Sequence, residues 1–471
     1  MPDEETSKKS PSPGRISPIV PMVIACGMFM NQLDSTIIAT SIPQIAESLG
    51  ESPLRLNLAI TSYLISLAVF IPISGWIADR FGARRTFCWA IALFTLSSAL
   101  CGVATSLSML VAMRIVQGLG GAMMTPVGRL ILIRTFPKEQ LVTAMSYASM
   151  PALIGPTIGP IVGGFLTEYI SWRWIFFINI PIGLLGILLS LRFIRNFRQP
   201  SSPRFDFGGF LLLGAGLALL ELGIEYLGRK LVPPAVDAAL FLSACVLLGL
   251  YAWHALKRAN PVLDLTLFRL RSFRTSTLAG GLCRLAIGGV PFLLPLQLQL
   301  GFGLDPLHSG LLTFVTSIGA MAMKTVVRRV LKHFGFRNLL AWNGVLLGLT
   351  IAGIGAFTKT SPHWLLLGYL LAYGFVRSVQ FTSVTVLGYA DLTPPIMSKG
   401  TSMASVVQQL CNSFGVAISA MLLTLMVGPQ GEPTQDDFRL VFVLVGLFPI
   451  LAMIDFLRLK PGDGAQVSGR D

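Results

Sequence analysis

Long apolar stretches alternate with short polar segments along most of this chain of 471 residues. A helix needs about 20 mostly apolar residues to cross the hydrocarbon core of a bilayer. The polar segments are too short to form a soluble domain. The pattern therefore predicts an all-α polytopic membrane protein with fourteen transmembrane helices, at residues 17–41, 56–78, 86–104, 108–134, 140–167, 173–194, 207–227, 234–254, 273–300, 307–328, 338–358, 364–390, 401–427 and 438–458.

Basic residues gather in alternate segments between the predicted spans. One set of segments, together with the two chain ends, carries 25 of the 36 Lys and Arg residues, and the opposite set carries six. Cytoplasmic loops of membrane proteins are enriched in Lys and Arg. We therefore expect both termini in the cytoplasm. The first span is expected to be retained rather than cleaved as a signal peptide.

A short repeat divides the predicted spans into two sets. Phe81-Gly82-Ala83-Arg84 follows the second span, and Phe334-Gly335-Phe336-Arg337 follows the tenth. Repeated halves are typical of secondary transporters. Because the offset is eight spans rather than six, two helices are predicted to be inserted between the halves. The expected order is a tail at 1–16, a six-helix bundle at 17–200, two inserted helices at 201–260, a second six-helix bundle at 261–458 and a tail at 459–471.

Composition argues against several other classes of protein. Only 12% of the residues are charged, compared with about 25% in ordinary soluble proteins. The net charge of +14 does not indicate nucleic-acid binding, because the basic residues lie in short loops. The six Cys and four His residues show no metal-site, disulfide or catalytic spacing, and no nucleotide-binding loop occurs. We expect no enzyme activity, no metal and no cofactor, so an ion gradient must drive any uphill transport.

One acid and one base stand out inside the spans, where ionisable side chains are costly and usually functional. Asp34 and Arg114 fall in the outer halves of spans one and four, at the same depth, so they could pair. Movement of Arg114 would change how readily Asp34 holds a proton. A static ion pair that joins two helices is the alternative.

Other charged residues inside the spans have less certain roles. Arg284 and Arg377 lie near mid-membrane, whereas Lys324 is near the inner end of its span and is expected to extend to the interface. Glu221 and Glu225 lie one turn apart near the outer end of span seven and are expected to face the interface. Arg129 is the remaining basic residue inside a span.

The fifth span contains a run of Gly and Pro at residues 155–164. Three of its glycines recur every four residues, so they share one helix face and let another backbone approach closely. The prolines are expected to kink the helix. Two interpretations remain open, a tight helix crossing or a bending element that seals the interface between two moving bundles. The residues concerned are Gly155, Pro156, Gly159, Pro160, Gly163 and Gly164.

The turn between spans two and three carries an acid among basic residues. Asp79 could cap or bridge to a neighbouring helix end, with Arg80, Arg84 or Arg85 as its partner. A solvated turn would explain the arginines but not Asp79, because an acid adds nothing to the positive-inside rule.

Several of these segments resemble motifs of the major facilitator superfamily, in its fourteen-helix drug:proton antiporter group. The resemblance covers nearly the whole chain. It is carried by Leu33-Asp34-Ser35-Thr36 with Pro43, by Gly75 to Arg85, by Arg114 to Gly121, by Gly155 to Gly164 and by Trp172 to Pro181.

The resemblance implies a major facilitator fold with two six-helix bundles around a cavity, and proton-driven export of drug-like molecules by alternating access. It also implies that the protein lies in the inner (plasma) membrane of a bacterium. It links Arg114, with Asp34, to proton coupling. Gln117, Arg284 and Arg377 are candidates for the substrate cavity. The two arginines also raise an alternative substrate, an endogenous anionic metabolite or metal chelate. Conformational gating is expected of Gly75, Asp79, Arg80, Gly82, Arg84, Gly155, Pro156, Gly159, Pro160, Gly163 and Gly164.

The expected partners are a small-molecule substrate, protons and the lipid bilayer, without nucleic acid. The protein is expected to act as a monomer, and a periplasmic adaptor is left open. A membrane receptor is disfavoured, because the sequence contains no signalling or ligand-binding domain.

The predicted topology can be tested with reporters fused after the last residue. A reporter active only in the cytoplasm should be active there, because fourteen spans return the chain to its starting side. The matched fusion carries a reporter active only in the periplasm. Activity of that second fusion would show that the number of spans is odd.

Overall fold

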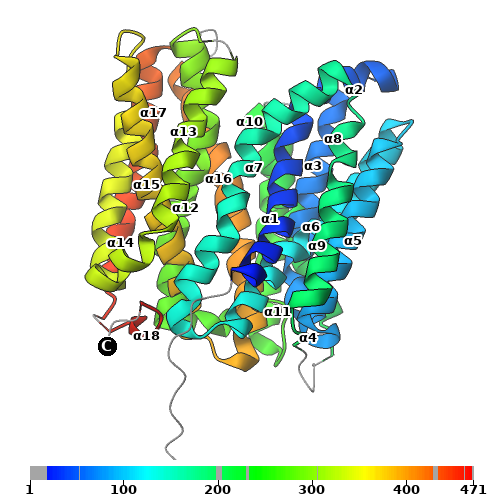
Figure 1. Cartoon of the computed structure of the whole chain (residues 1–471), viewed down its shortest axis with the longest axis vertical. Coiled ribbons are helices and arrows are strands. Elements are labelled where there is room, and N and C mark those ends of the chain that lie inside the picture. The colour runs from blue at the N-terminus through cyan, green and yellow to red at the C-terminus, as the bar shows by residue number, and fades with distance from the viewer. Residues whose placement is uncertain are drawn as a thin grey trace, which may run out of the picture.

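The computed structural model describes residues 18–51, 53–197, 204–229, 233–304, 306–427, 433–460 and 462–468. The predicted tail at 1–16 lies outside these residues, as do residues 461 and 469–471 of the predicted tail at 459–471. The described chain is built of helices, and no strand occurs in it. Figure 1 shows the helices running side by side in two groups.

The N-terminal group comprises α1 to α9. Within it, α1 packs against α7, α9 and α6, while α6 also packs against α3 and α5. A short 3₁₀ segment continues α1 into α2, and another joins α3 to α4. The helices are α1 (Ile19–Ile37), α2 (Ile42–Leu49), α3 (Pro53–Phe70), α4 (Ser74–Phe81), α5 (Ala83–Gly102), α6 (Leu107–Thr135), α7 (Leu141–Tyr169), α8 (Trp174–Phe177) and α9 (Asn179–Phe193).

The C-terminal group comprises α12 to α18. Here α12 packs against α16, α17 and α15, while α14 packs against α17 and α15, and α13 packs against α15. The helices are α12 (Arg271–Leu296), α13 (Pro306–Lys324), α14 (Val327–Ile354), α15 (His363–Leu387), α16 (Met397–Val427), α17 (Gln435–Phe456) and α18 (Ala465–Ser468).

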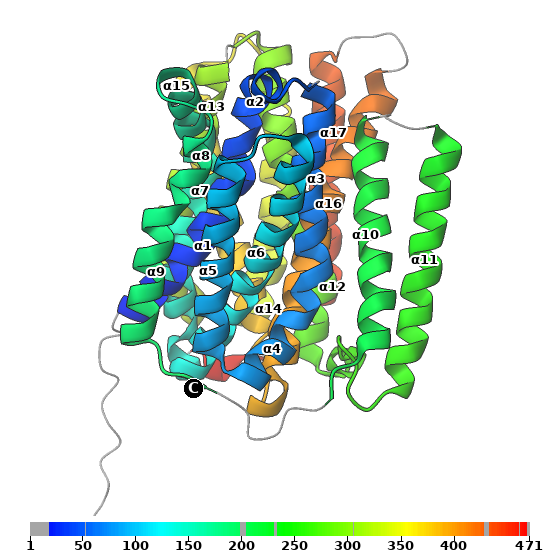
Figure 2. The same ribbon diagram turned by 90° about the vertical axis from the view of Figure 1, so that its right-hand side faces the viewer.

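Two helices lie beside these groups, at the predicted insertion. Helix α10 (Phe207–Arg229) packs against α3 of one group and α16 of the other, and α11 (Pro234–Lys257) packs mainly against α10. Figure 2 shows both at the edge of the molecule, with α11 outermost. Large apolar side chains of α11, including Leu242 and Trp253, are more than half exposed. In a bilayer this surface would contact lipid.

The number of membrane spans is not settled by the helices alone. Ten helical segments are individually long and apolar enough to cross a membrane, or up to thirteen if each bent pair counts as one span. One such pair joins α13 and α14 with a bend of 83°, where the sequence predicts two separate spans. Within the described residues, each predicted span overlaps a helix. The count of fourteen remains a prediction.

The sequence repeat has a structural counterpart. Gly82 follows α4 with a φ of 96°, and Gly335 interrupts α14 with a φ of 72°, so each ends a short helix at a sharp turn. A residue with a side chain rarely adopts such a φ. After each glycine an arginine reaches the end of another helix: Arg84 donates to the carbonyl oxygen of Ile194 after α9, and Arg337 donates to that of Leu457 after α17.

The glycine face of α7 packs against α1. A Cβ atom at Gly155 would lie 3.0 Å from the backbone nitrogen of Leu33, and one at Gly163 would lie 2.6 Å from the carbonyl oxygen of Ile37. These glycines therefore pack within the N-terminal group, whereas α7 also packs against α13 and α15 of the C-terminal group. The gating role of the glycines stays a prediction. The predicted kink is present, since the parts Lys138–Pro156 and Ile161–Tyr169 differ in direction by 47°.

The close approach of α7 and α1 predicts the cost of a larger side chain. A Cβ atom at Gly159 would clash with Thr36, whereas nothing lies within 4 Å of one at Gly164. Gly159→Leu should therefore lower the free energy of unfolding by about 1–3 kcal/mol, the usual cost of overpacking. Gly164→Leu should change it little. Thermal unfolding of the purified protein in detergent compares the two variants, and equal melting temperatures would contradict the packing.

Candidate functional site

A buried polar cluster surrounds Asp34 in the N-terminal group. Arg114 donates from Nη1 to Asp34 Oδ2 at 2.5 Å, and Gln117 donates from Nε2 to Asp34 Oδ1 at 2.8 Å. Asn179, the first residue of α9, also donates to Oδ1, at 3.4 Å. All four residues are at most 1% exposed. The predicted pair of Asp34 and Arg114 is thus present, and both carboxylate oxygens accept hydrogen bonds.

Arg114 is held by more than its ion pair. Its Nε donates to the carbonyl oxygen of Ala59 at 3.1 Å, and its guanidinium lies 4.3 Å from the centre of the Tyr63 ring. Tyr63 in turn donates to Asn31 on α1. Arg114 Nη2 is buried without a hydrogen-bond partner. One donor therefore remains available if the side chain turns toward another acceptor.

Small residues on α6 allow these helices to meet. A Cβ atom at Gly118 would lie 2.8 Å from the carbonyl oxygen of Tyr63 on α3, and one at Gly120 would lie 2.9 Å from that of Ala90 on α5. The backbones approach closely because no side chain separates them. This packing places Arg114, one turn earlier on α6, between α3 and Asp34 of α1.

The structure changes the role expected of one residue and adds another. Gln117 was predicted to line a substrate cavity, but its side chain is fully buried and holds Asp34. Asn179 was not among the predicted site residues, although its position as a polar residue opening an apolar helix was a usable signal. Asn179 also donates to Ser98 on α5 at 3.0 Å, which orients its amide toward Asp34.

Asp79 links three helices at the end of the molecule that carries α4 and α18, which we call the basic end. Its Oδ1 accepts from Arg134 on α6 at 2.9 Å, and its Oδ2 accepts from Ser398, in the first turn of α16. Asp79 therefore bridges to a neighbouring helix end, as predicted, but the expected partners were wrong. Arg80 is exposed, and Arg84 reaches the end of α9 instead.

Further contacts join the two groups near the basic end. Ser74 lies 3.0 Å from Ser402 on α16, between hydroxyl oxygens, and Lys138 donates to the carbonyl oxygen of Ala390 at 2.8 Å. A Cβ atom at Gly75 would lie 2.7 Å from the carbonyl oxygen of Ser398, so only glycine permits this approach. The groups are therefore closed on each other at this end. The side chain of Pro160, also predicted to take part in gating, lies outside the described residues.

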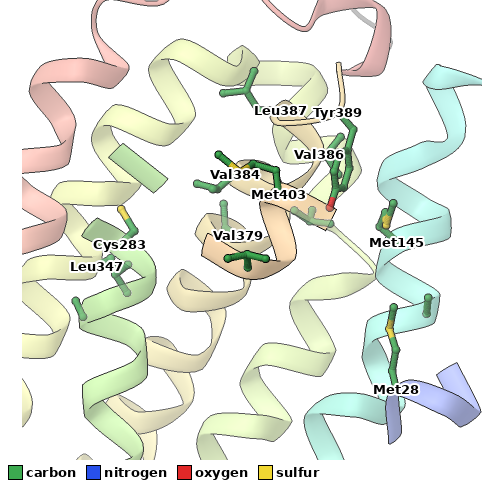
Figure 3. Packing of buried hydrophobic residues seen from close by; sticks show 14 of the residues in the cluster. Met28, Met145, Cys283, Leu347, Val379, Val384, Val386, Leu387, Tyr389 and Met403 are labelled. Atoms are coloured by element: carbon green, nitrogen blue, oxygen red, sulfur yellow. The ribbon is translucent and has the colours of Figure 1, made fainter. Parts of the chain in front are cut away.

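Apolar side chains complete the same contact region. Figure 3 shows Met28 and Met145 on the side of the N-terminal group, with Val384, Tyr389 and Met403 on the C-terminal side. All five are at most 7% exposed and belong to one buried cluster. Their packing excludes solvent between the groups at this level.

The predicted basic residues of the second half lie in this region too. Arg284 on α12 is 3% exposed and contacts Thr385 on α15, while Arg377 on α15 is partly exposed beside the ring of Tyr373. Lys324 does not extend to the interface as predicted. It is 5% exposed, and its Nζ donates to Thr382.

The two acids of α10, Glu221 and Glu225, were predicted to face the membrane interface, but both contact other helices. Glu221 is 6% exposed and accepts from Ser413 on α16 at 3.0 Å. Glu225 accepts from Thr61 on α3 at 3.3 Å. One inserted helix therefore contacts both groups through neighbouring carboxylates.

A cavity at the surface of the molecule lies away from these residues. It measures about 400 Å³ and is open to the surface, between Arg204–Gly208 and Arg258–Asn260. It contains neither the Asp34 cluster nor the contacts between the groups. Within the described part of the chain, no three His, Cys, Asp or Glu side chains are placed to hold a metal ion.

Comparison with known proteins identifies the family. The Major Facilitator Superfamily model matches residues 24–416 and 277–470. The chain belongs to the major facilitator superfamily. MdtD of Serratia proteamaculans (strain 568), named provisionally as a multidrug resistance protein, is 42% identical over 402 residues, 85% of this chain and 84% of that protein. MdtD of Escherichia fergusonii, named in the same way, is 38% identical over 450 residues, 94% and 95% of the two chains.

Solved structures of the superfamily share the fold. The human organic anion transporter MFSD10 (TETRAN) gives a TM-score of 0.68 at 17% identity, covering 94% of this chain and all of that one. The proton:xylose symporter XylE gives 0.67 at 16% identity, covering 95% and 96%. The chain is therefore a multi-pass membrane transporter with a major facilitator fold, as predicted, and not an enzyme.

The contacts of Asp79 predict the effect of removing its charge. Asp79→Asn loses the ion pair with Arg134 and weakens the contact with Ser398, so the basic end should open more often. The opening is measured as the distance distribution between spin labels attached at Arg85 and Thr393, which are exposed and lie in different groups. The labels are introduced in a variant from which the native cysteines have been removed. A longer-distance population should appear. Arg80→Gln, in the same turn, is the control and should leave the distances unchanged. An unaltered distribution for Asp79→Asn would contradict a latching role.

Proposed function

We propose that the protein is a proton-coupled antiporter that exports small drug-like molecules across the inner membrane by alternating access. The observation that carries the proposal is the fully buried ion pair of Asp34 and Arg114, with a separate set of contacts closing one end between the groups. Relatives named provisionally for multidrug resistance support the substrate class.

Proton coupling follows from the charge balance at Asp34. Ionised Asp34 attracts Arg114 and accepts from two further donors. A proton on Asp34 removes the charge that holds Arg114, so the guanidinium can turn away and pull on α6. Return of Arg114 favours release of the proton. Protonation of Asp34 and the position of α6 are then thermodynamically coupled, so that each shifts the equilibrium of the other.

Alternating access uses α6 as the connecting element. The same helix carries Arg114 toward one end and Arg134, the partner of Asp79, at the other. A shift of α6 would therefore alter both the proton site and the closed basic end. Residues 17–200 and 261–458 would rock as two bundles against each other, while α10 and α11 of the inserted region follow at the edge.

The basic loops and the family support an orientation in the membrane and a driving force. The basic end would face the cytoplasm, with both termini there, because it carries the excess of Lys and Arg. The protein would act as a monomer, driven by the proton gradient without a cofactor. Protons entering from outside would be exchanged for substrate leaving the cell.

Substitution of the ion pair tests the proposal. Asp34→Asn should abolish uphill efflux driven by a pH gradient but spare part of the downhill movement, because the neutral amide imitates the protonated acid. Arg114→Ala should also uncouple transport, and Arg114→Lys should restore only part of it, because Lys lacks the planar fork. Everted vesicles with ethidium and rhodamine 6G, with and without a pH gradient, measure both activities.

Asp436→Asn is the matched control, since this acid is exposed in the first turn of α17. It should pump as the unaltered protein does. If Asp34→Asn still pumps uphill, the proton carrier is another residue and the proposed mechanism fails.

A further inference from the structure

Four basic residues meet where the two groups are closed on each other. Arg129 comes from α6 of the N-terminal group, and Arg284, Lys324 and Arg377 come from α12, α13 and α15 of the C-terminal group. Arg129, Arg284 and Lys324 are 7%, 3% and 5% exposed. Arg129 is close enough to repel both Arg284 and Lys324, and Arg377 repels Lys324. We call these four residues the cationic cluster.

The partners of the cationic cluster are neutral. Arg129 donates to Gln408 at 2.8 Å, Arg284 contacts Thr385 at 3.4 Å, and Lys324 donates to Thr382 at 2.5 Å. The guanidinium of Arg377 lies 5.7 Å from the centre of the Tyr373 ring. Arg284 Nε is buried with no hydrogen-bond partner. In the described residues, none of the four forms an ion pair with a carboxylate.

This arrangement contrasts with that of two other basic residues that are wholly or largely buried, Arg114 and Arg134. Arg114 is paired with Asp34, and Arg134 is paired with Asp79. Burial of an unpaired cation is costly, and mutual repulsion of several cations adds to that cost. Such a cluster does not favour the stability of the folded protein. Its presence is explained if a negative charge occupies it during the transport cycle.

We propose that the cationic cluster binds a small organic anion that carries two or three negative charges on carboxylate or phosphate groups, and that this anion is a transported substrate. The inference rests on the proposed export function and names its substrate class. Arginine presents a planar fork that matches carboxylate and phosphate oxygens, and lysine adds a compact charge. Because the cluster draws on both groups, the anion would neutralise charges on each side of the interface.

The space at the cluster shows when the anion binds. A cavity of about 30 Å³ is lined by Arg129 and Lys324, together with Met28, Met145, Ala148, Ser149, Phe381, Thr382 and Thr385. A site of about 10–15 Å³ holds one water, so this cavity is too small for anything larger than about two or three water molecules. The anion therefore binds after the groups separate at the basic end, and Arg129 moves away from the other three residues as they do.

Binding to the purified full-length protein tests the inference. Tricarballylate, succinate and glycerol 1-phosphate are titrated in detergent by calorimetry at constant ionic strength, with ethidium and sodium chloride for comparison. The di- and trianions should bind saturably, and the trianion should bind most tightly. Arg284→Gln and Lys324→Met should weaken it at least tenfold, Arg284→Lys should weaken it less, and Arg439→Gln, an exposed cation on α17, should have no effect.

Stability without ligand separates a binding role from a structural one. If the cluster is a binding site, Arg284→Gln and Lys324→Met should unfold at the same temperature as the unaltered protein or higher, because repulsion is relieved. Lower melting temperatures with unchanged anion binding would overturn the inference. So would an anion effect that sodium chloride reproduces at the same ionic strength.

Transport in vesicles distinguishes this inference from the proposed function. Ethidium efflux driven by a pH gradient without any binding of the three anions would overturn the anion site and leave the proposed function intact. Anion binding that depends on Arg284 and Lys324, with no pH-driven transport of either anion or dye, would support the site and overturn proton-coupled export.

Discussion

A buried charge in a membrane protein needs a partner, and the ion pair of Asp34 and Arg114 meets that need in the N-terminal group. Its geometry depends on α1, α3, α5, α6 and α9 together, because these helices supply the two charges, Gln117, Asn179 and the residues that hold them. Any movement of α6 must change this pair. The same helix carries Arg134 to the closed end, so α6 connects the proposed proton site to the proposed gate.

The charges of the two groups are handled differently. Within the N-terminal group, Asp34 is balanced by Arg114 and Asp79 by Arg134, an arrangement that would suit the proposed proton coupling. At the contact between the groups, Arg284 and Lys324 have only neutral hydroxyl partners. Balanced charge is suited to coupling, and unbalanced charge is suited to binding a ligand that supplies the missing sign. The two functions can thus occupy separate places in one fold.

Glycine serves three different purposes in this chain. At Gly82 and Gly335 glycine adopts a positive φ, which allows a sharp turn between a short helix and the longer helix that follows it. At Gly118 and Gly120 it lets α6 reach its neighbours, and at Gly75 it lets the N-terminal group reach α16. At Gly155 and Gly163 it fastens α7 to α1. Only the contact at Gly75 lies between the groups, so it is the one that must break and reform if the groups move.

The sequence by itself determined where the helices lie along the chain and the repeat, because the bilayer imposes a simple rule of length and polarity along the chain. Depth alone was enough to pair Asp34 with Arg114, since few ionisable residues share that level. It was not enough for Asp79, whose partners Arg134 and Ser398 lie 55 and 319 residues away. Nor could it show that the glycines of α7 face α1 or that Lys324 is buried. Which helices become neighbours depends on packing between distant segments, and only the tertiary structure decided it.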